Sequence, residues 1–307
     1  MTHLWLMNKE MKPYSLEWIV DSSYEGKLLR EFLIDQQISK RTLTSVKFDG
    51  GLITVNGKEV NVRYVLHERD FVKITFPKEV SSDALVGKEF PLTIVYEDND
   101  VLIIDKDWGI PSIPTNDHDV NSLAAGIYGY YQRVGISSTV HIVTRLDKDT
   151  SGLILIAKHR HVHHLFSLQQ KDRRIQRSYE AIAQGKLLFQ KGTIEAPIGR
   201  KDDSIIEREV REDGQPAITH YDVLKQYKGF AHVQLKLETG RTHQIRVHMS
   251  SIGHPLVGDD LYGGDLNILN RQALHCRSLA FFHPIKRIWM SFSSMLPEDM
   301  KNLLDGR

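Results

Sequence analysis

The 307-residue sequence contains a single cysteine, Cys276. One cysteine excludes an internal disulfide framework and fits the reducing cytoplasm. No apolar run approaches the ~20 residues that a helix needs to cross a bilayer. The sequence also lacks a glycine-rich phosphate-binding loop and a dinucleotide-binding fingerprint. These absences argue against a disulfide scaffold, a membrane protein and a nucleotide-cofactor enzyme. We interpret Cys276 as a small buried core residue and expect the protein to be cytoplasmic.

Metal-ligand patterns are scarce as well. Four histidines stand close together, and two of them, His159 and His163, are four positions apart, as ligands on one helix face would be. However, no cysteine or acidic residue accompanies them at the usual ligand spacing. The other two are His161 and His164. We therefore predict no metal site.

The formal net charge of +1 does not by itself suggest a nucleic-acid partner, but its distribution does. Residues 158–178 hold six basic side chains against Asp172 alone: Lys158, Arg160, Lys171, Arg173, Arg174 and Arg177. Such a stretch can bind phosphate locally within a neutral protein. The alternative is that these cations form the solvated face of a helix.

Length and composition (41% hydrophobic, 26% charged) indicate a globular protein with room for two domains. The patterns predict an N-terminal extension over 1–26, a small module over 27–77, a linker over 78–90 and a larger domain over 91–307. Helical and strand patterns are mixed in both domains, so we predict the α+β class. In the larger domain we expect a hairpin near 92–104, helices over 121–134 and 159–174, and several strands after residue 179.

The small module has signals for two helices and a small sheet. Apolar residues recur at helical spacing over 28–33, and Ser39 can cap a second helix. The Asn56-Gly57 pair between β-prone runs predicts a hairpin, and a last strand follows over 70–76. The module resembles an RNA-binding module first seen in a small-subunit ribosomal protein. By that resemblance the cations of the second helix would contact phosphates: Lys40, Arg41 and Lys47. The alternative is a folded appendage.

The segment from Thr144 to Gly152 places Arg145 and Asp147 in a polar turn before the apolar run 153–157. A carboxylate beside a cation at the end of a buried strand is suited to chemistry, so Asp147 is the leading candidate. The same residue types are also ordinary turn formers. Asp149 raises the possibility of a paired carboxylate for glycosidic acid/base work, but nothing else in the sequence supplies a sugar site.

Two later segments join this candidate. Tyr179 begins an apparent strand beside the basic stretch, where it could pack in the core or stack on a base. In residues 237–249, Arg241 and Arg246 flank His243 in a turn that enters a helix. A buried arginine requires a partner. Asp147 could be that partner, and a local acid such as Glu238 is the alternative.

Together these segments resemble the RluA/RluD family of large-subunit ribosomal RNA pseudouridine synthases. The resemblance rests on Arg145-Leu146-Asp147-x-x-Thr150-Ser151-Gly152, on Tyr179, and on Gly240-Arg241-x-His243-Gln244-Ile245-Arg246-Val247-His248, and it extends in order over residues 90–293. Two positions depart from it. The family usually has His where this chain has Thr144, and Lys-Pro-x-Gly where it has Lys106-Asp107-Trp108-Gly109.

The resemblance implies a pseudouridine synthase domain with a mixed, mostly antiparallel sheet flanked by helices. It implies catalysis by Asp147, Tyr179 and Arg246, with Tyr179 packing on the uracil or helping to remove a proton. RNA would be bound by Arg145, Arg173, Arg174, Arg241 and His243 in addition to the small module. No cofactor, metal or obligate protein partner is implied. The expected substrate is structured RNA, most of all ribosomal RNA; transfer RNA and a non-catalytic RNA-binding role are the alternatives.

Overall fold

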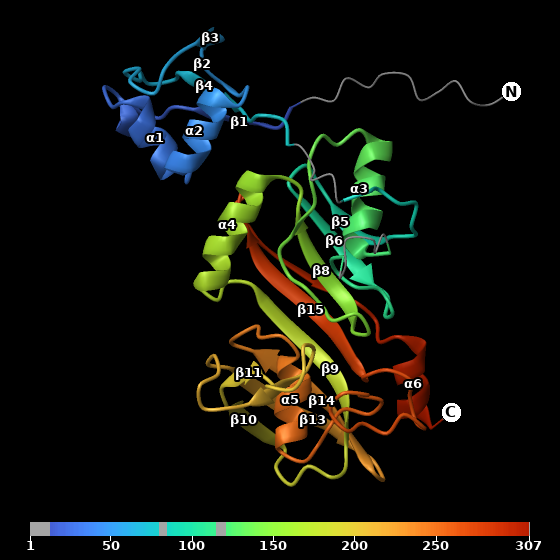
Figure 1. The fold of residues 1–307 in the computed structure, drawn as a ribbon. Coiled ribbons are helices and arrows are strands. Elements are labelled where there is room, and N and C mark those ends of the chain that lie inside the picture. Colours follow the sequence, from blue (N-terminus) through green and yellow to red (C-terminus); the bar gives the residue numbers. More distant parts are fainter. Residues whose placement is uncertain (1–12, 80–84, 115–120, 307) are drawn as a thin grey trace, which may run out of the picture.

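The computed structural model describes residues 13–79, 85–114 and 121–306. It shows a small N-terminal module beside a larger domain built around one long sheet (Figure 1). Parts of the expected extension and linker, residues 1–12 and 80–84, lie outside the described residues. No helix among the described residues is long and apolar enough to span a membrane.

The small module has a four-stranded sheet in the order β1-β4-β2-β3, packed against two helices. As expected, Ser39 caps the second helix, its Oγ accepting from the Thr42 N–H at 3.1 Å. Asn56 and Gly57 both have positive φ, as the hairpin turn between β2 and β3 requires. The elements are β1 (Ser15–Ile19), a 3-10 turn (Ser22–Tyr24), α1 (Leu29–Asp35), α2 (Lys40–Phe48), β2 (Leu52–Val55), β3 (Lys58–Glu59) and β4 (Phe71–Thr75).

The sheet of this module begins earlier than the predicted residue 27. Strand β1 pairs antiparallel with β4, with Leu16 opposite Ile74. Leu16 and Trp18 pack on the module core from one side of β1. This pairing joins segments more than fifty residues apart in the chain, and a five-residue strand carries little local signal of its own. For that reason the sequence pattern alone assigned the strand to an extension.

The larger domain continues the chain with strands and helices that flank the ten-stranded sheet. Its elements are β5 (Thr93–Glu97), β6 (Val101–Lys106), α3 (Leu123–Val134), β7 (His141–Ile142), β8 (Ser151–Ala157), α4 (Arg160–Lys171), β9 (Gln176–Gln184), β10 (Lys191–Glu195), β11 (Ile198–Arg200), β12 (Arg208–Val210), β13 (Ile218–Gln226), β14 (Phe230–Leu237), α5 (Gln244–Ser251), β15 (Leu274–His283), β16 (Ile288–Ser293) and α6 (Glu298–Asp305).

The central sheet runs β10-β13-β14-β9-β15-β8-β6-β5, with β16 beside β15 and β7 beside β8. The pair β15–β8 is parallel and the other pairs are antiparallel, so the expected mixed, mostly antiparallel sheet is confirmed. All residues of β8 are buried, which explains its unbroken apolar run. Cys276 lies fully buried on β15, as expected, and burial raises the pKa of its thiol to about 12.

The expected linker is packed where the structure describes it. The Lys88 N–H donates to the Ala125 carbonyl at 3.1 Å, so this segment runs along α3. A Cβ on Gly129 would overlap the Lys88 carbonyl, and one on Gly126 would lie 3.0 Å from Phe90. Glycines are therefore needed at these two positions of α3, because the chain before β5 passes too close to the helix for a side chain.

Candidate active site

Asp147 lies in the loop between β7 and β8, and three bonds from other segments fix that loop. Ser112 Oγ donates to the Leu146 carbonyl at 2.6 Å and accepts from the Leu146 N–H at 3.2 Å. Lys106 Nζ donates to the Lys148 carbonyl at 3.0 Å. Backbone groups on both sides of Asp147 are therefore held, which limits where its carboxylate can point.

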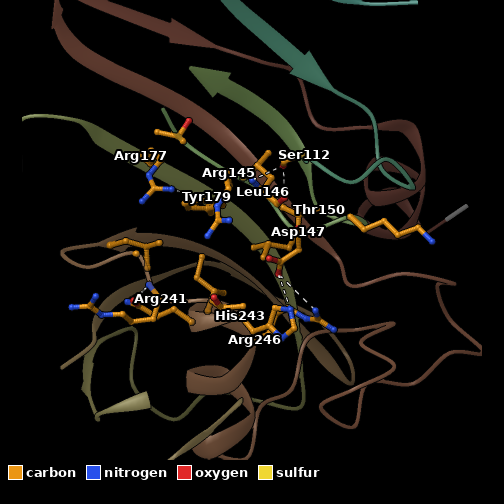
Figure 2. A pocket seen from close by; sticks show the side chains of 18 of the residues that line it. Ser112, Arg145, Leu146, Asp147, Thr150, Arg177, Tyr179, Arg241, His243 and Arg246 are labelled. Carbon is orange, nitrogen blue, oxygen red and sulfur yellow. Dashed lines mark hydrogen bonds and ion pairs between the residues drawn. The ribbon is translucent and has the colours of Figure 1, made fainter. Parts of the chain in front are cut away.

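A cavity of about 510 Å³ opens in front of this loop (Figure 2). The loop, β9 and the turn that enters α5 all contribute to its wall. These segments are far apart in the chain, so the fold brings together the residues that the sequence had placed in three separate segments. Six of the predicted site residues line the cavity: Arg145, Asp147, Tyr179, Arg241, His243 and Arg246.

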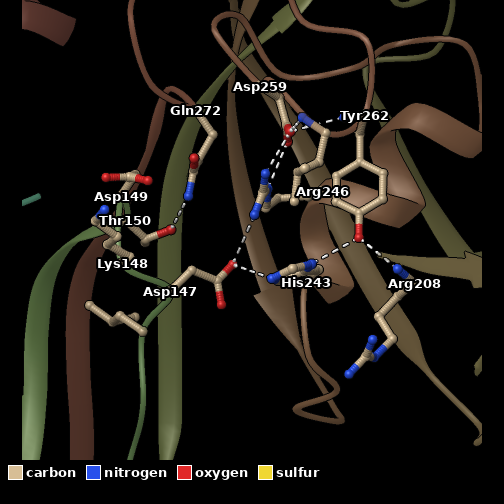
Figure 3. Close-up of polar contacts among 12 residues, drawn as sticks. Asp147, Lys148, Asp149, Thr150, Arg208, His243, Arg246, Asp259, Tyr262 and Gln272 are labelled. Atoms are coloured by element: carbon tan, nitrogen blue, oxygen red, sulfur yellow. Dashed lines mark hydrogen bonds and ion pairs between the residues drawn. The ribbon is translucent and has the colours of Figure 1, made fainter. Parts of the chain in front are cut away.

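Arg246 is 4% exposed and makes its strongest contacts with Asp259 (Figure 3). Its Nε and Nη2 donate to the two Asp259 oxygens at 2.8 and 2.7 Å, and Nη2 lies 3.3 Å from Asp260 Oδ1. Asp147 Oδ2 is farther away, 3.7 Å from Arg246 Nη1. The expected pairing of Arg246 with Asp147 is present, but the prediction missed the main partner. A buried guanidinium needs a bidentate acid of this kind, and Asp259 is fully buried beside it.

The contacts of Arg246 with Asp259 and Asp147 determine the protonation of its guanidinium. Burial lowers the pKa of Arg246, but the bonds to Asp259 and the charges of Asp259 and Asp147 more than offset it and raise that pKa overall. The guanidinium therefore stays charged. Asp259 binds Nε and Nη2 of Arg246, so the remaining nitrogen of Arg246, Nη1, faces Asp147. The side chain of Asp147 is 28% exposed.

Tyr179 sits on β9, 4% exposed, and lines the cavity. Its hydroxyl accepts a hydrogen bond from Arg177 Nη1 at 3.2 Å. Burial raises the pKa of the phenol well above its ordinary value, with the charge of Arg177 opposing that shift. The hydroxyl therefore stays protonated near neutral pH, which makes the ring a packing surface and the hydroxyl a poor base.

The predicted RNA-binding residues fall into three places. A second cavity of about 830 Å³ shares Arg177 and Arg241 with the first and is also lined by Arg173. Arg173 forms an ion pair with Glu238, the acid that had been considered for Arg241 or Arg246. Arg174 lies outside both cavities, with its guanidinium 4.9 Å from the Phe282 ring. The exposed cations of α2 lie on the small module, away from both cavities: Lys40, Arg41 and Lys47.

The two departures from the family pattern lie next to the loop that carries Asp147. Thr144 Oγ1 accepts the Leu155 N–H at 3.0 Å, so a hydroxyl ties the start of the loop to β8. Beside Asp107, Lys106 is 2% exposed and donates to the Asp107 and Ile110 carbonyls at 2.8 and 2.9 Å. Burial lowers the pKa of Lys106 to about 7. Thr144 also lines the cavity, whereas Asp107 does not.

Three of the four histidines considered for a metal, His159, His161 and His163, stack on other rings. His159 stacks on Tyr14 with ring centroids 3.7 Å apart, and His161 stacks on Phe76 at 5.3 Å, so α4 carries the contact with the small module. The described residues place another potential ligand group at Asp98, Asp100 and His283. There Lys286 Nζ lies 2.7 Å from Asp98, so a protein cation already occupies that carboxylate.

Some residues of the site were missed. Asp259 and Tyr262 lie in the segment after α5 that was compared with the family but were given no role, and Arg177 was counted only as part of the basic stretch. Tyr262 lies under Arg246, whose guanidinium carbon is 5.0 Å from the ring centroid. An Asp-x-x-Tyr sequence after a helix has no chemical signature on its own. What could have identified Asp259 is the requirement of a buried Arg246 for an acid.

Comparison with known proteins agrees with this geometry. Residues 100–251 match a family model described as RNA pseudouridylate synthase. The chain is 49% identical to the uncharacterized RNA pseudouridine synthase YjbO of Bacillus subtilis, over 91% of this chain and 98% of that protein. It is 38% identical to ribosomal large subunit pseudouridine synthase D of Pseudomonas aeruginosa, over 83% of each. Human RNA pseudouridylate synthase domain containing 1 has a similar structure, with a TM-score of 0.58 and 26% identity over 74% of this chain and 89% of that chain.

Proposed function

The chain belongs to the RNA pseudouridine synthase family, and from that premise we propose that it converts specific uridines of large-subunit ribosomal RNA to pseudouridine, with Asp147 acting on the nucleoside. The observation that carries the assignment of Asp147 is its position: a half-buried carboxylate at a cavity wall, 3.7 Å from a guanidinium that Asp259 holds in place. We also propose that the protein acts in the cytoplasm, which a role in ribosomal RNA modification supports.

The reaction sets clear requirements for the site. The glycosidic bond is cleaved, the base turns over, and it is rejoined to the ribose through carbon, with no change in redox state. Because a stacked base hides these atoms, the uridine must first leave its stack. We propose that Arg145, exposed on the loop beside Asp147, fills the gap in the RNA. A planar cation suits that place because it can stack on bases and offset phosphate charge together.

Asp147 then meets the everted nucleoside with an ionised oxygen. Its Oδ2 faces Arg246, while Oδ1 has no protein partner among the described residues and is available to the substrate. The carboxylate acts either as a nucleophile on the sugar or as a base toward a sugar proton. Both roles place one carboxylate oxygen against the sugar, and Arg246, held by Asp259, lies 3.7 Å from the other oxygen as a fixed cation.

Tyr179 supports this chemistry by packing against the uracil. Its raised pKa favours this use over proton removal, which was the other role implied by the family resemblance. A protonated phenol next to Arg177 presents a flat ring and a fixed hydroxyl dipole to the cavity.

We propose that the RNA backbone crosses the second cavity and reaches the small module. Arg173 and Arg241 line that cavity together with Lys171 and Lys236, and Glu238 is the acid among them. The three exposed cations of α2 would add phosphate contacts that raise affinity without reading sequence: Lys40, Arg41 and Lys47.

The choice of large-subunit ribosomal RNA rests on the named relatives and is tested directly. The purified protein is incubated separately with large-subunit ribosomal RNA and with transfer RNA, and pseudouridines are mapped at nucleotide resolution. We expect new pseudouridine at one or a few sites of the ribosomal RNA, and loss of the same sites in cells without the protein. Modification confined to transfer RNA would replace the proposed substrate. No modification of any RNA would favour a non-catalytic RNA-binding role.

A further inference from the structure

His243 has an unusual backbone and a side chain that is held from behind. It precedes α5 with φ of 57° and ψ of 17°, a left-handed conformation that costs a non-glycine residue energy and is found more often at functional sites. Its side chain does not cap the helix. Instead its Nδ1 lies 2.8 Å from the Tyr262 hydroxyl, and its Nε2 lies 4.0 Å from Asp147 Oδ2 (Figure 3).

The hydrogen bonds of Tyr262 favour one tautomer of this ring. The Tyr262 oxygen accepts the backbone N–H of Arg208 at 2.9 Å. The hydroxyl has one hydrogen to donate, and Nδ1 of His243 is the acceptor that the described residues place in its reach. In a neutral ring whose Nδ1 accepts, the hydrogen is on Nε2. Burial lowers the pKa of His243, with Asp147 opposing and Arg246 adding to that shift, so the ring is neutral near pH 7.

The Nε2–H therefore points at the same oxygen of Asp147 that Arg246 Nη1 faces. We infer that His243 is a positioning residue, locked by Tyr262 as the Nε2–H tautomer, that holds Asp147 Oδ2 and leaves Oδ1 for the nucleoside. The 4.0 Å separation is that of the unliganded site, and catalytic hydrogen bonds commonly shorten when substrate binds. This inference rests on the proposed function, and it revises the expectation that His243 contacts RNA.

The two side chains that face Asp147, Arg246 and His243, differ in charge and in directionality. Arg246 is tied to Asp259 and presents a fixed cation to Asp147 Oδ2. His243 is neutral and directional, so it sets the rotation of the carboxylate without adding charge. A positioning role predicts a loss in turnover with little change in RNA affinity.

The test uses variants that preserve the backbone. Asparagine tolerates the left-handed conformation and can still reach Tyr262, but it is too short to present a donor at the place of Nε2. Glutamine can present one. We expect His243→Asn to lower kcat about 10- to 100-fold, the loss of one charge-assisted hydrogen bond, with KM within about threefold of wild type. His243→Gln should recover most of that loss.

Tyr262→Phe removes only the hydroxyl and keeps the ring beneath Arg246. We expect it to lower kcat about 3- to 10-fold, since the ring of His243 is then free to exchange its tautomer. Because Tyr262 acts through His243, adding Tyr262→Phe to His243→Asn should cost nothing further. Tyr227→Phe, at the turn between β13 and β14, is the matched control and should leave kcat unchanged. Losses that multiply in the double variant would overturn the inference.

A spectroscopic measurement separates this inference from the proposed function. Nitrogen NMR of protein labelled in histidine distinguishes the two neutral tautomers, and the His243→Asn spectrum identifies the signal. We expect the Nε2–H form in the wild type and a mixture in Tyr262→Phe. An Nδ1–H form in the wild type would overturn the inference even if the enzyme is active. If the wild type modifies no RNA, the proposed function fails and so does the kinetic half of the inference, while the spectrum still decides the tautomer.

Discussion

The cavity around Asp147 and the outer face of α2 both present cations, but they hold them in different ways. In the cavity, Arg246 is buried and bound through Nε and Nη2 by the two oxygens of Asp259, so the position of its charge is fixed. On α2, Lys40, Arg41 and Lys47 are exposed on a nine-residue helix. A fixed buried charge can act on one oxygen, whereas mobile exposed charges attract any phosphate. The first arrangement is suited to chemistry and the second to affinity.

The largest expected effect is at the carboxylate itself. Asp147→Asn keeps the size of the side chain but removes the anion, so turnover should fall by at least ~10³-fold, or roughly 4 kcal/mol of barrier. RNA affinity should stay within about threefold of wild type, since no phosphate contact is lost. Single-turnover kinetics and filter binding measure the two quantities. Asp149→Asn, two positions along the same turn, is the control and should retain most of the activity.

The next effect is at the support of Arg246. Asp259→Asn leaves a buried guanidinium without its bidentate anion, so the free energy of unfolding should fall by about 3 kcal/mol. Turnover should fall about 100-fold, because Arg246 is then free to move toward or away from Asp147. Chemical denaturation and kcat report these two losses. Asp260→Asn is the matched control, since Asp260 is largely exposed and contacts Arg246 at 3.3 Å; a loss there as large as for Asp259 would contradict the account.

These two predictions show what the sequence could and could not supply. Asp147, Tyr179 and Arg246 became candidates because each stands in a segment that resembles the family, and they line one cavity. The resemblance implied the mixed sheet, and periodicity predicted most helices. Asp259 and Tyr262 were not assigned roles, because their importance comes from contacts with α5 that no local pattern encodes. Strand β1 was missed for a similar reason, since its pairing with β4 is remote in sequence. Local signals were sufficient where a segment acts alone and failed where the partner is distant in the chain.

A smaller effect is expected on the small module. Replacing Lys40, Arg41 and Lys47 together by glutamine should weaken RNA binding about 10-fold near ~0.1 M salt and reduce the dependence of log affinity on log salt by up to about 2 to 3 units. The rate at saturating protein should not change, because none of the three lines the cavity of Asp147. Affinity measured over a salt series tests this. An unchanged salt dependence would show that α2 does not contact the RNA.

The smallest effect concerns the contact between the small module and the N-terminal end of α4 in the larger domain. Burial lowers the pKa of His159 and of His161 to about 4, against about 6.5 in an unfolded chain. A lowered pKa means that the stabilisation is complete above about pH 6.5 and is lost as the pH falls toward about 4. Over that range the unfolded chain takes up protons that the buried rings beside Tyr14 and Phe76 do not, so the free energy of unfolding should fall. Thermal unfolding at pH 7 and pH 4.5 measures it. His161→Phe, which keeps a ring but does not titrate, should reduce the acid sensitivity, while His164→Phe should not.

The central claim is that the cavity around Asp147 carries the chemistry, whereas α2 contributes only affinity. Single-turnover conversion of large-subunit ribosomal RNA at saturating protein, measured for two variants side by side, tests it most directly. The account predicts that the triple glutamine variant of Lys40, Arg41 and Lys47 converts uridine at a rate within about threefold of wild type. It predicts that Asp147→Asn is slower by at least ~10³-fold in the same assay. Conversion by Asp147→Asn at a rate near that of wild type would contradict the account.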